Sequence, residues 1–185
     1  MAGRYKLLLL LILRGHWIAE GKIAIILTSV ECENFMPRFM TNLSCVLKCN
    51  KLDQPVVDMD FFLARDFYNI SIAFSVKLVR AKSVMNYLTI RLDACAALSA
   101  LHDHFLTRII ANEIRDASNF PLSCPFEKNK HYYMRNYKVN GDALPNYVPE
   151  LSFTSIGDFY AGRRKTFRFL LSGRVTKVHD STRKG

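Results

Sequence analysis

One helical pattern, enclosed by two cysteines, constrains the fold most, because the other repeating patterns in this chain are typical of β-strands. Between Asp93 and Pro125, apolar residues recur at spacings of three to five, which is the stripe of an amphipathic helix. The stripe consists of Leu98, Leu101, Phe105, Ile109 and Ile114, with Leu106 and Ile110 beside them. A helix with such a stripe must lie on an apolar surface, so we expect it to pack on strands.

Cys95 and Cys124 stand at the two ends of this stretch. Two prolines flank Cys124 and turn-forming residues precede it, so the chain can return there toward Cys95. We therefore expect a disulfide between the two, with a helix that ends near Ala117 and an extended return. The bond would enclose 28 residues and would stabilise the fold by about 3 kcal/mol, mainly by restricting the unfolded chain.

The strand-like patterns have a period of two, which places alternate side chains on opposite faces of a sheet. The clearest is Ile70–Leu78, in which bulky apolar residues alternate with Ser, Ala and Lys. Further strands are predicted at Phe39–Leu47, Val57–Leu63, Tyr87–Leu92, Tyr133–Val139, Leu151–Phe153, Thr166–Leu171 and Val175–Val178, with a turn at Gly157–Asp158 and a break at Gly173. About seven short strands, joined by brief links, and one docked helix favour a mainly β, antiparallel sandwich over a barrel or an α/β sheet.

The same alternation predicts which way individual side chains point. Cys45 is expected to face the interior, and Asp58 and Asp60 are expected to face water. Tyr133 and Tyr137 are expected to share one face of their strand, together with Val139.

Length and charge limit the general class of the protein. The chain has 185 residues, half of them hydrophobic, which suits one globular domain. The formal net charge of +10 favours acidic partners, and part of this excess is local. After Ala161 the cations are Arg163, Arg164, Lys165, Arg168, Arg174, Lys177, Arg183 and Lys184, against one acidic residue that follows Lys177, Asp180.

The N-terminus resembles a secretory signal. Arg4 and Lys6 precede the apolar run Leu7–Leu13, and a second run, Ile23–Leu27, follows. Neither run has the ~18 to 20 apolar residues that a membrane-spanning helix needs, so we expect no permanent anchor. Cleavage near Ala19 and cleavage nearer Val30 both remain open, and we divide the chain into a leader at 1–30, a domain at 31–180 and a basic tail at 181–185.

Export is consistent with two other features of the sequence. Asn42 and Asn69 each begin an N-x-S sequon and are the expected glycosylation sites. The five cysteines form an even set if Cys32 is removed with the leader. We expect a secreted, extracellular protein, which makes nucleic acid a poor candidate partner.

Catalysis and metal binding lack the residues that they would require. His102 and His104 flank Asp103, but residues two apart on a helix point to different faces and cannot readily chelate one ion. Cys45 and Cys49 would supply only half of a zinc site. No Gly-rich phosphate loop, G-x-S-x-G elbow or H-E-x-x-H motif occurs. We therefore expect no enzyme, no metal and no cofactor.

Four short motifs resemble those of an insect family of small secreted proteins of largely unknown function. They are Phe39-Met40-Thr41-Asn42-Leu43-Ser44-Cys45, Leu92-Asp93-Ala94-Cys95, Ser123-Cys124-Pro125 and Gly157-Asp158-Phe159-Tyr160. The resemblance covers roughly Phe39 to Val178, and the D-A-C element followed about thirty residues later by S-C-P is its most specific part. The family groups with the ML (myeloid-differentiation-factor-related lipid-recognition) proteins, whose relatives include gustatory proteins implicated in sensing pheromones.

The resemblance implies an immunoglobulin-like, ML-like β-sandwich whose sheets can part to admit a lipid or other apolar ligand, with no catalytic residues. This chain departs from the family pattern in one respect. The family has a further cysteine on the second strand, where this sequence reads Phe61-Phe62. Cys49 is then the nearest candidate partner for Cys45.

Two functions follow as expectations. The first is a secreted carrier or sensor of a lipid or other hydrophobic small molecule, with a chemosensory, pheromone-related role and an extracellular receptor as a further partner. Its ligand-lining residues are expected to be Phe61, Ile72, Phe74, Val76, Leu88, Ile90, Phe167 and Phe169, because bulky residues on opposing inner faces would enclose a ligand. The second is an interaction module that binds an acidic receptor or a sulfated polysaccharide through its basic C-terminal face.

Overall fold

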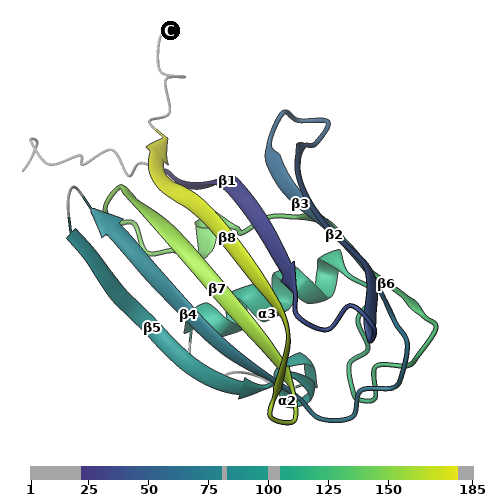
Figure 1. Ribbon diagram of the computed structural model, residues 1–185. Coiled ribbons are helices and arrows are strands. Elements are labelled where there is room, and N and C mark those ends of the chain that lie inside the picture. Colours follow the sequence, from purple (N-terminus) through teal and green to yellow (C-terminus); the bar gives the residue numbers. More distant parts are fainter. Residues whose placement is uncertain (1–21, 81–82, 100–104, 179–185) are drawn as a thin grey trace, which may run out of the picture.

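Figure 1 shows the computed structural model, which describes residues 22–80, 83–99 and 105–178. In this part of the chain there are eight β-strands, two α-helices and one short 3-10 helix. The strands are β1 (Lys22–Asn34), β2 (Met40–Cys49), β3 (Pro55–Leu63), β4 (Ile70–Arg80), β5 (Ser83–Asp93), β6 (His131–Tyr137), β7 (Leu151–Ala161) and β8 (Arg164–Val178). The helices are α2 (Ala94–Ser99), α3 (Phe105–Ala117) and the 3-10 helix η1 (Gly141–Ala143).

The strands form two antiparallel sheets. The larger sheet has the order β1-β8-β7-β4-β5, and the smaller sheet has the order β2-β3-β6. In Figure 1, helix α3 passes behind the strands of the larger sheet, and it contacts β6 of the smaller sheet. The predicted mainly β fold with antiparallel sheets is therefore confirmed.

The core lies between the sheets and follows the predicted alternation. In β3, Val57, Met59, Phe61 and Leu63 are buried in the same core cluster as Phe167 and Leu171 of the opposite sheet. Burial of side chains of this size contributes roughly 1.5–3 kcal/mol each, so the inner face of β3 alone stabilises the sandwich substantially. Residues of α3 add to this core, because Ile114 packs against it.

Two predicted breaks are wrong, because β7 and β8 are each longer than expected. Gly157 and Asp158 lie in the middle of β7, opposite Phe169 and Arg168, and the chain turns instead at Gly162, whose φ is 62°. Gly173 lies within β8 directly opposite Phe153. A Cβ atom at Gly173 would lie 2.6 Å from the Phe153 ring, so this glycine provides room for the ring and does not end a strand.

The first strand begins within the range that was expected to be the leader. β1 begins at Lys22 and pairs with β8 from Val178 to Phe167, so residues 22–30, expected in the leader, belong to the larger sheet. A domain that started at residue 31 would lack most of this edge strand, including the buried side chains of Ile23 and Leu27. Residues 1–21 and the tail at 181–185 lie outside the described part of the chain.

The helical stretch consists of two described helices where one was predicted. β5 ends at Asp93 and α2 starts at Ala94, so Cys95 lies in the first turn of a helix and not at the end of a strand. Helix α3 ends at Ala117, as expected, and an extended segment follows it. Ser118 in this segment pairs with Met134 of β6.

A β-bulge in β6 reverses the expected face of Tyr133. Val57 and Met59 of β3 pair with Tyr137 and Met134, so three steps along β6 match two steps along β3. The extra residue lets both Met134 and Tyr137 face the core, whereas Tyr133 lies on the other face. The prediction that Tyr133 and Tyr137 share a face is therefore wrong.

Candidate functional site

A cavity of about 750 Å³ lies between the two sheets. Its volume is within the ~300–1,000 Å³ range of typical small-molecule sites. The larger sheet contributes Ile72 and Phe74 to its wall, helix α3 contributes Ala111 and Ile114, and the loop after β6 contributes Val148. Most of the lining side chains are apolar, so the cavity suits a molecule whose surface is mainly apolar.

One end of the cavity is closed by aromatic rings. Phe159 and Phe167 stack with their centroids 4.0 Å apart. Phe61 of the smaller sheet lies 6.3 Å from Phe167 and 5.9 Å from Phe120, which follows α3. Rings in these tilted and stacked arrangements stabilise each other by about 0.5–1.5 kcal/mol per pair beyond their burial, so the aromatic contacts stabilise this end of the cavity.

The other end opens to solvent between β5 and the loop after η1. Met85 and Tyr87 from β5 and Tyr147 from the loop line the cavity while remaining 56%, 52% and 84% exposed. Arg80 and Ser83 lie at the same end of the β4–β5 hairpin. These residues form the mouth of the cavity.

Six of the eight residues predicted to line a ligand site lie on the cavity wall. They are Phe61, Ile72, Phe74, Val76, Phe167 and Phe169. Leu88 and Ile90 are not among the described residues of the wall, although they pair with Val76 and Phe74. Both lie on β5, the edge strand of the larger sheet. The alternation of the sequence predicts the face on which a side chain lies but does not predict how far that side chain is from a cavity.

Several wall residues were not predicted from the sequence. Strict alternation would place Tyr87 on the face opposite Leu88, but a bulge between Val76 and Lys77 leaves Tyr87 without a cross-strand partner and at the cavity mouth. The loop at 139–149 has no periodic pattern from which its approach to the cavity could have been found. Ile114 was identified only as part of a helical stripe.

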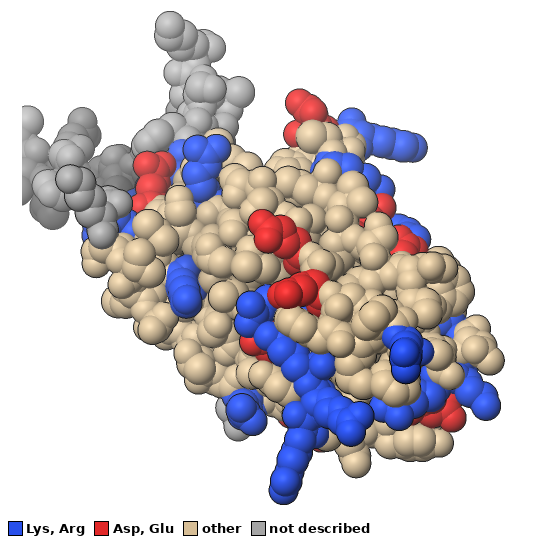
Figure 2. Space-filling view, viewed as in Figure 1, with Lys and Arg blue, Asp and Glu red and all other residues tan. Residues whose placement is uncertain are grey.

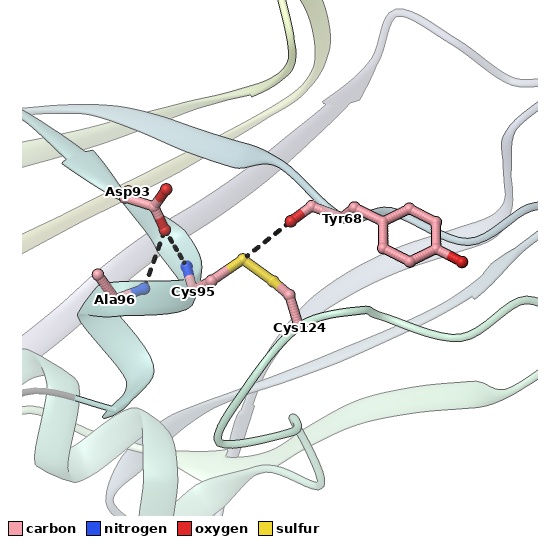
Figure 3. Close-up of a disulfide and its surroundings, with 5 residues drawn as sticks. All are labelled: Tyr68, Asp93, Cys95, Ala96 and Cys124. Atoms are coloured by element: carbon pink, nitrogen blue, oxygen red, sulfur yellow. Dashed lines mark hydrogen bonds between the residues drawn. A yellow bond between two sulfur atoms is a disulfide. The ribbon is translucent and has the colours of Figure 1, made fainter.

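The expected bond between Cys95 and Cys124 is present in the structure (Figure 3), with Cα atoms 5.5 Å apart. The carboxylate of Asp93 caps α2, because its Oδ1 atom accepts hydrogen bonds from the backbone N–H groups of Cys95, at 2.8 Å, and Ala96, at 2.9 Å. The Cys95 Sγ atom also lies 3.6 Å from the carbonyl oxygen of Tyr68. The bond thus ties the end of β5 to the segment after α3, beside the closed end of the cavity, where Ala94 lines the wall.

Cys49, the nearest candidate partner for Cys45, is not bonded to it. Cys45 is bonded to Cys32 of β1, with Cα atoms 6.0 Å apart, and Cys49 is exposed and free. Cys45 and Cys49 lie four residues apart on one strand, which separates their Cα atoms by about 13 Å, whereas a disulfide requires about 4.4–6.8 Å. Because β1 and β2 belong to different sheets, the Cys32–Cys45 bond joins the two layers of the sandwich.

Asp58 and Asp60 lie on the outer face of the smaller sheet in ion pairs. Asp58 pairs with Lys48 at 2.5 Å. Asp60 pairs with the guanidinium of Arg135 and accepts a 2.7 Å hydrogen bond from His131. The Arg135 hydrogen bond, with a smaller contribution from His131, lowers the pKa of the Asp60 carboxyl despite its partial burial. This arrangement is a structural network on a solvated face.

Other candidates from the sequence do not form a site in the described residues. His102, Asp103 and His104 lie outside the part of the chain that is described. No group of three or more His, Cys, Asp or Glu side chains is placed to hold a metal ion within residues 22–80, 83–99 and 105–178. Across the same ranges, none of the helices is long and apolar enough to span a membrane. Asn42 and Asn69, the predicted glycosylation sites, are both exposed.

The basic C-terminal face is partly neutralised. Asp158 of β7 binds Arg168, with 2.7 and 3.1 Å hydrogen bonds, and Lys165, at 2.7 Å. Arg163 and Arg164 are exposed near the β7–β8 turn. Figure 2 shows Lys and Arg side chains gathered toward this end of the molecule, with few acidic groups among them.

Residues 68–155 match a known family. Its model is described as "Protein of unknown function (DUF1091)", and the matched range runs from just before β4 to the middle of β7, which includes much of the cavity wall. Among solved structures, the chain is similar to the "Crystal structure of a Niemann-Pick type C2 protein from Japanese carpenter ant", with 13% identity, a TM-score of 0.28, and coverage of 83% of this chain and 92% of that chain. No curated protein matches the chain.

Proposed function

We propose that this protein binds a lipid or other apolar small molecule in the cavity between its sheets. The observation that carries the proposal is the combination of a 750 Å³ apolar cavity, a closed aromatic end and an open mouth. Cores normally pack without voids larger than a water molecule, so an apolar space of this size favours a binding site over a packed core. The proposed lining residues are the six predicted ones that lie on the wall, and no residue is assigned a catalytic role.

We further propose that the protein acts outside the cell as a carrier or sensor. Two disulfides among the described residues suit an oxidising compartment, and exposed sequons at Asn42 and Asn69 suit glycosylation during export. A chemosensory role, with a receptor as partner, rests on the family resemblance of the sequence motifs.

Native mass spectrometry of protein secreted from insect cells tests the proposal directly. We expect a bound small molecule that is released on denaturation and extracts into organic solvent. Absence of a co-purified lipid, together with no binding of long-chain fluorescent probes, would contradict the proposed function.

A variant that fills the cavity makes this test specific. Ala111 lies on the cavity-facing side of α3, so Ala111→Phe would place a ring in the space. Asn112 is exposed on the same helix, and Asn112→Phe adds the same ring outside the cavity. We expect Ala111→Phe to weaken probe binding by at least about 10-fold through overpacking, and Asn112→Phe to leave it unchanged. Equal effects of the two variants would show that the probe binds elsewhere.

Binding of an acidic partner through the basic face is the second candidate. The exposed cations Arg163 and Arg164 favour it, whereas Lys165 and Arg168 already have a carboxylate partner in Asp158. The dependence of binding on salt concentration distinguishes the two functions. Attachment through surface cations weakens as ionic strength rises, whereas occupation of an apolar cavity changes little.

A further inference from the structure

Tyr137 is a buried polar residue on the cavity wall. It ends β6 opposite Val57, is 4% exposed and lines the cavity. The bulge that turns it inward is held by a specific contact, because the backbone N–H of Asn136 donates a 2.8 Å hydrogen bond to Asp58. Asn136 adopts a positive φ of 51°, which asparagine tolerates better than most residues. The fold thus presents this phenol to the cavity by a defined backbone feature.

The hydroxyl of Tyr137 has no hydrogen-bond partner in the described residues. Tyr132 of the same strand provides a contrast. Its hydroxyl accepts a 2.7 Å hydrogen bond from the Glu127 N–H and donates a 3.4 Å hydrogen bond to the Glu127 carbonyl oxygen. Within the described residues, no side-chain N or O atom is both fully buried and unpaired. The Tyr137 oxygen must therefore keep some accessible surface, and the cavity is the space that this residue lines.

The other buried polar side chain of the described cavity wall is already occupied. Thr166 donates a 3.0 Å hydrogen bond to the Phe159 carbonyl oxygen. Burial raises the pKa of the Tyr137 phenol above its usual range, so the group stays neutral and can both donate and accept. Buried tyrosine hydroxyls usually find a partner, and leaving one unpaired in an apolar site costs free energy.

We propose that Tyr137 binds a single oxygen function, such as a hydroxyl, ketone or ester carbonyl, of an otherwise apolar ligand. This inference rests on the proposed function and narrows it from apolar molecules in general to oxygenated lipids. Val57, opposite Tyr137, lies four residues along β3 from Phe61, or about 13 Å from the aromatic end. The ligand therefore has an apolar tail against the aromatic rings and its oxygen function nearer the mouth.

Two ligands of equal chain length test the assignment, 1-hexadecanol and hexadecane, each competing with a fluorescent naphthylamine probe. We expect wild-type protein to prefer the alcohol. Tyr137→Phe should weaken binding of the alcohol by about 3- to 10-fold, the value of one hydrogen bond, and leave binding of the alkane unchanged. Tyr132→Phe is the matched control, because it removes a buried hydroxyl that is already bonded to Glu127. It should not distinguish the two ligands.

Stability without ligand gives a second readout. Tyr137→Phe removes a hydroxyl that has no partner among the described residues, so it should not lower the urea midpoint, whereas Tyr132→Phe should lower it. An equal loss of affinity for both ligands, or no loss for either, would overturn the assignment and leave the proposed function standing. Failure of the wild-type protein to bind either ligand would overturn both.

Discussion

The effect of a single residue in this sandwich depends on the residue opposite it on the neighbouring strand. Gly173 is an example, because the ring of Phe153 on the neighbouring strand occupies the space that a Cβ atom of residue 173 would need. A Cβ atom there would also lie 2.9 Å from the backbone oxygen of Ile26, which cannot move as a side-chain end can. The identity of this residue is therefore set by packing and not by backbone conformation.

We expect Gly173→Ala to destabilise the protein by about 1–3 kcal/mol, as overpacking of a core does. Gly157→Ala is the control, because its Cβ atom would lie 3.1 Å from the edge of the Phe159 ring, a contact that a small side-chain shift relieves. Urea unfolding of both variants measures the difference. Equal midpoints for the two variants would contradict this account of Gly173.

At the scale of elements, the β7–β8 hairpin combines a long apolar inner face with a charge cluster. Asp158 stands directly opposite Arg168 and also contacts Lys165, and its side chain is 18% exposed. The Arg168 hydrogen bond, followed by that of Lys165, lowers the pKa of the Asp158 carboxyl. The cluster therefore stabilises the hairpin while the carboxyl is ionised, and it occupies two cations of the basic face.

Asp158→Asn should lower stability at pH 7 by roughly 1–2 kcal/mol. Because the folded-state pKa is depressed, the wild-type advantage is fully present above the ordinary aspartate pKa of about 3.9 and is lost as pH falls through the folded-state value. Urea midpoints of both proteins from pH 7 to pH 3 measure this. Asp142→Asn is the control, because the Lys22–Asp142 pair is exposed and should contribute little. A difference between Asp158→Asn and wild type that persisted unchanged at pH 3 would rule out the ion pair as its cause.

For the whole molecule, the two disulfides fix how the layers meet around the cavity. Cys32–Cys45 joins β1 of the larger sheet to β2 of the smaller sheet. Cys95–Cys124 joins the start of α2 to the segment that returns from α3. One bond therefore links the sheets directly, and the other anchors the helical layer beside the closed end of the cavity.

We expect the double substitution Cys32→Ala and Cys45→Ala to cost about 3 kcal/mol, the chain-entropy value for a loop of this length. Cys49→Ser should change stability by less than about 0.5 kcal/mol, because Cys49 is exposed and free. Thermal unfolding measures both effects. Peptide mapping of the unreduced protein provides the independent check, and a peptide that joins Cys45 to Cys49 would refute the assigned pairing.

The sequence by itself determined the faces of the strands and the long-range disulfide. Alternation in Val57–Leu63 and Ile70–Leu78 gave the correct inner faces, because side-chain direction in a strand follows from the local backbone alone. The proline-flanked Cys124 similarly indicated a return to Cys95. Both are consequences of short segments and their immediate neighbours.

Only the tertiary structure decided where alternation shifts and what encloses the cavity. The bulges beside Tyr87 and Tyr137 move these side chains to the cavity. Each bulge depends on how two strands pair, and that pairing cannot be read from the sequence of either strand alone. Whether Gly173 ends a strand or makes room for Phe153 likewise depends on the residue across the sheet. The same holds for Cys32, whose partner lies in the other layer. A local sequence period predicts the face to which a side chain points. How far that side chain lies from the cavity, and what fills the space beside it, depend on how the layers assemble.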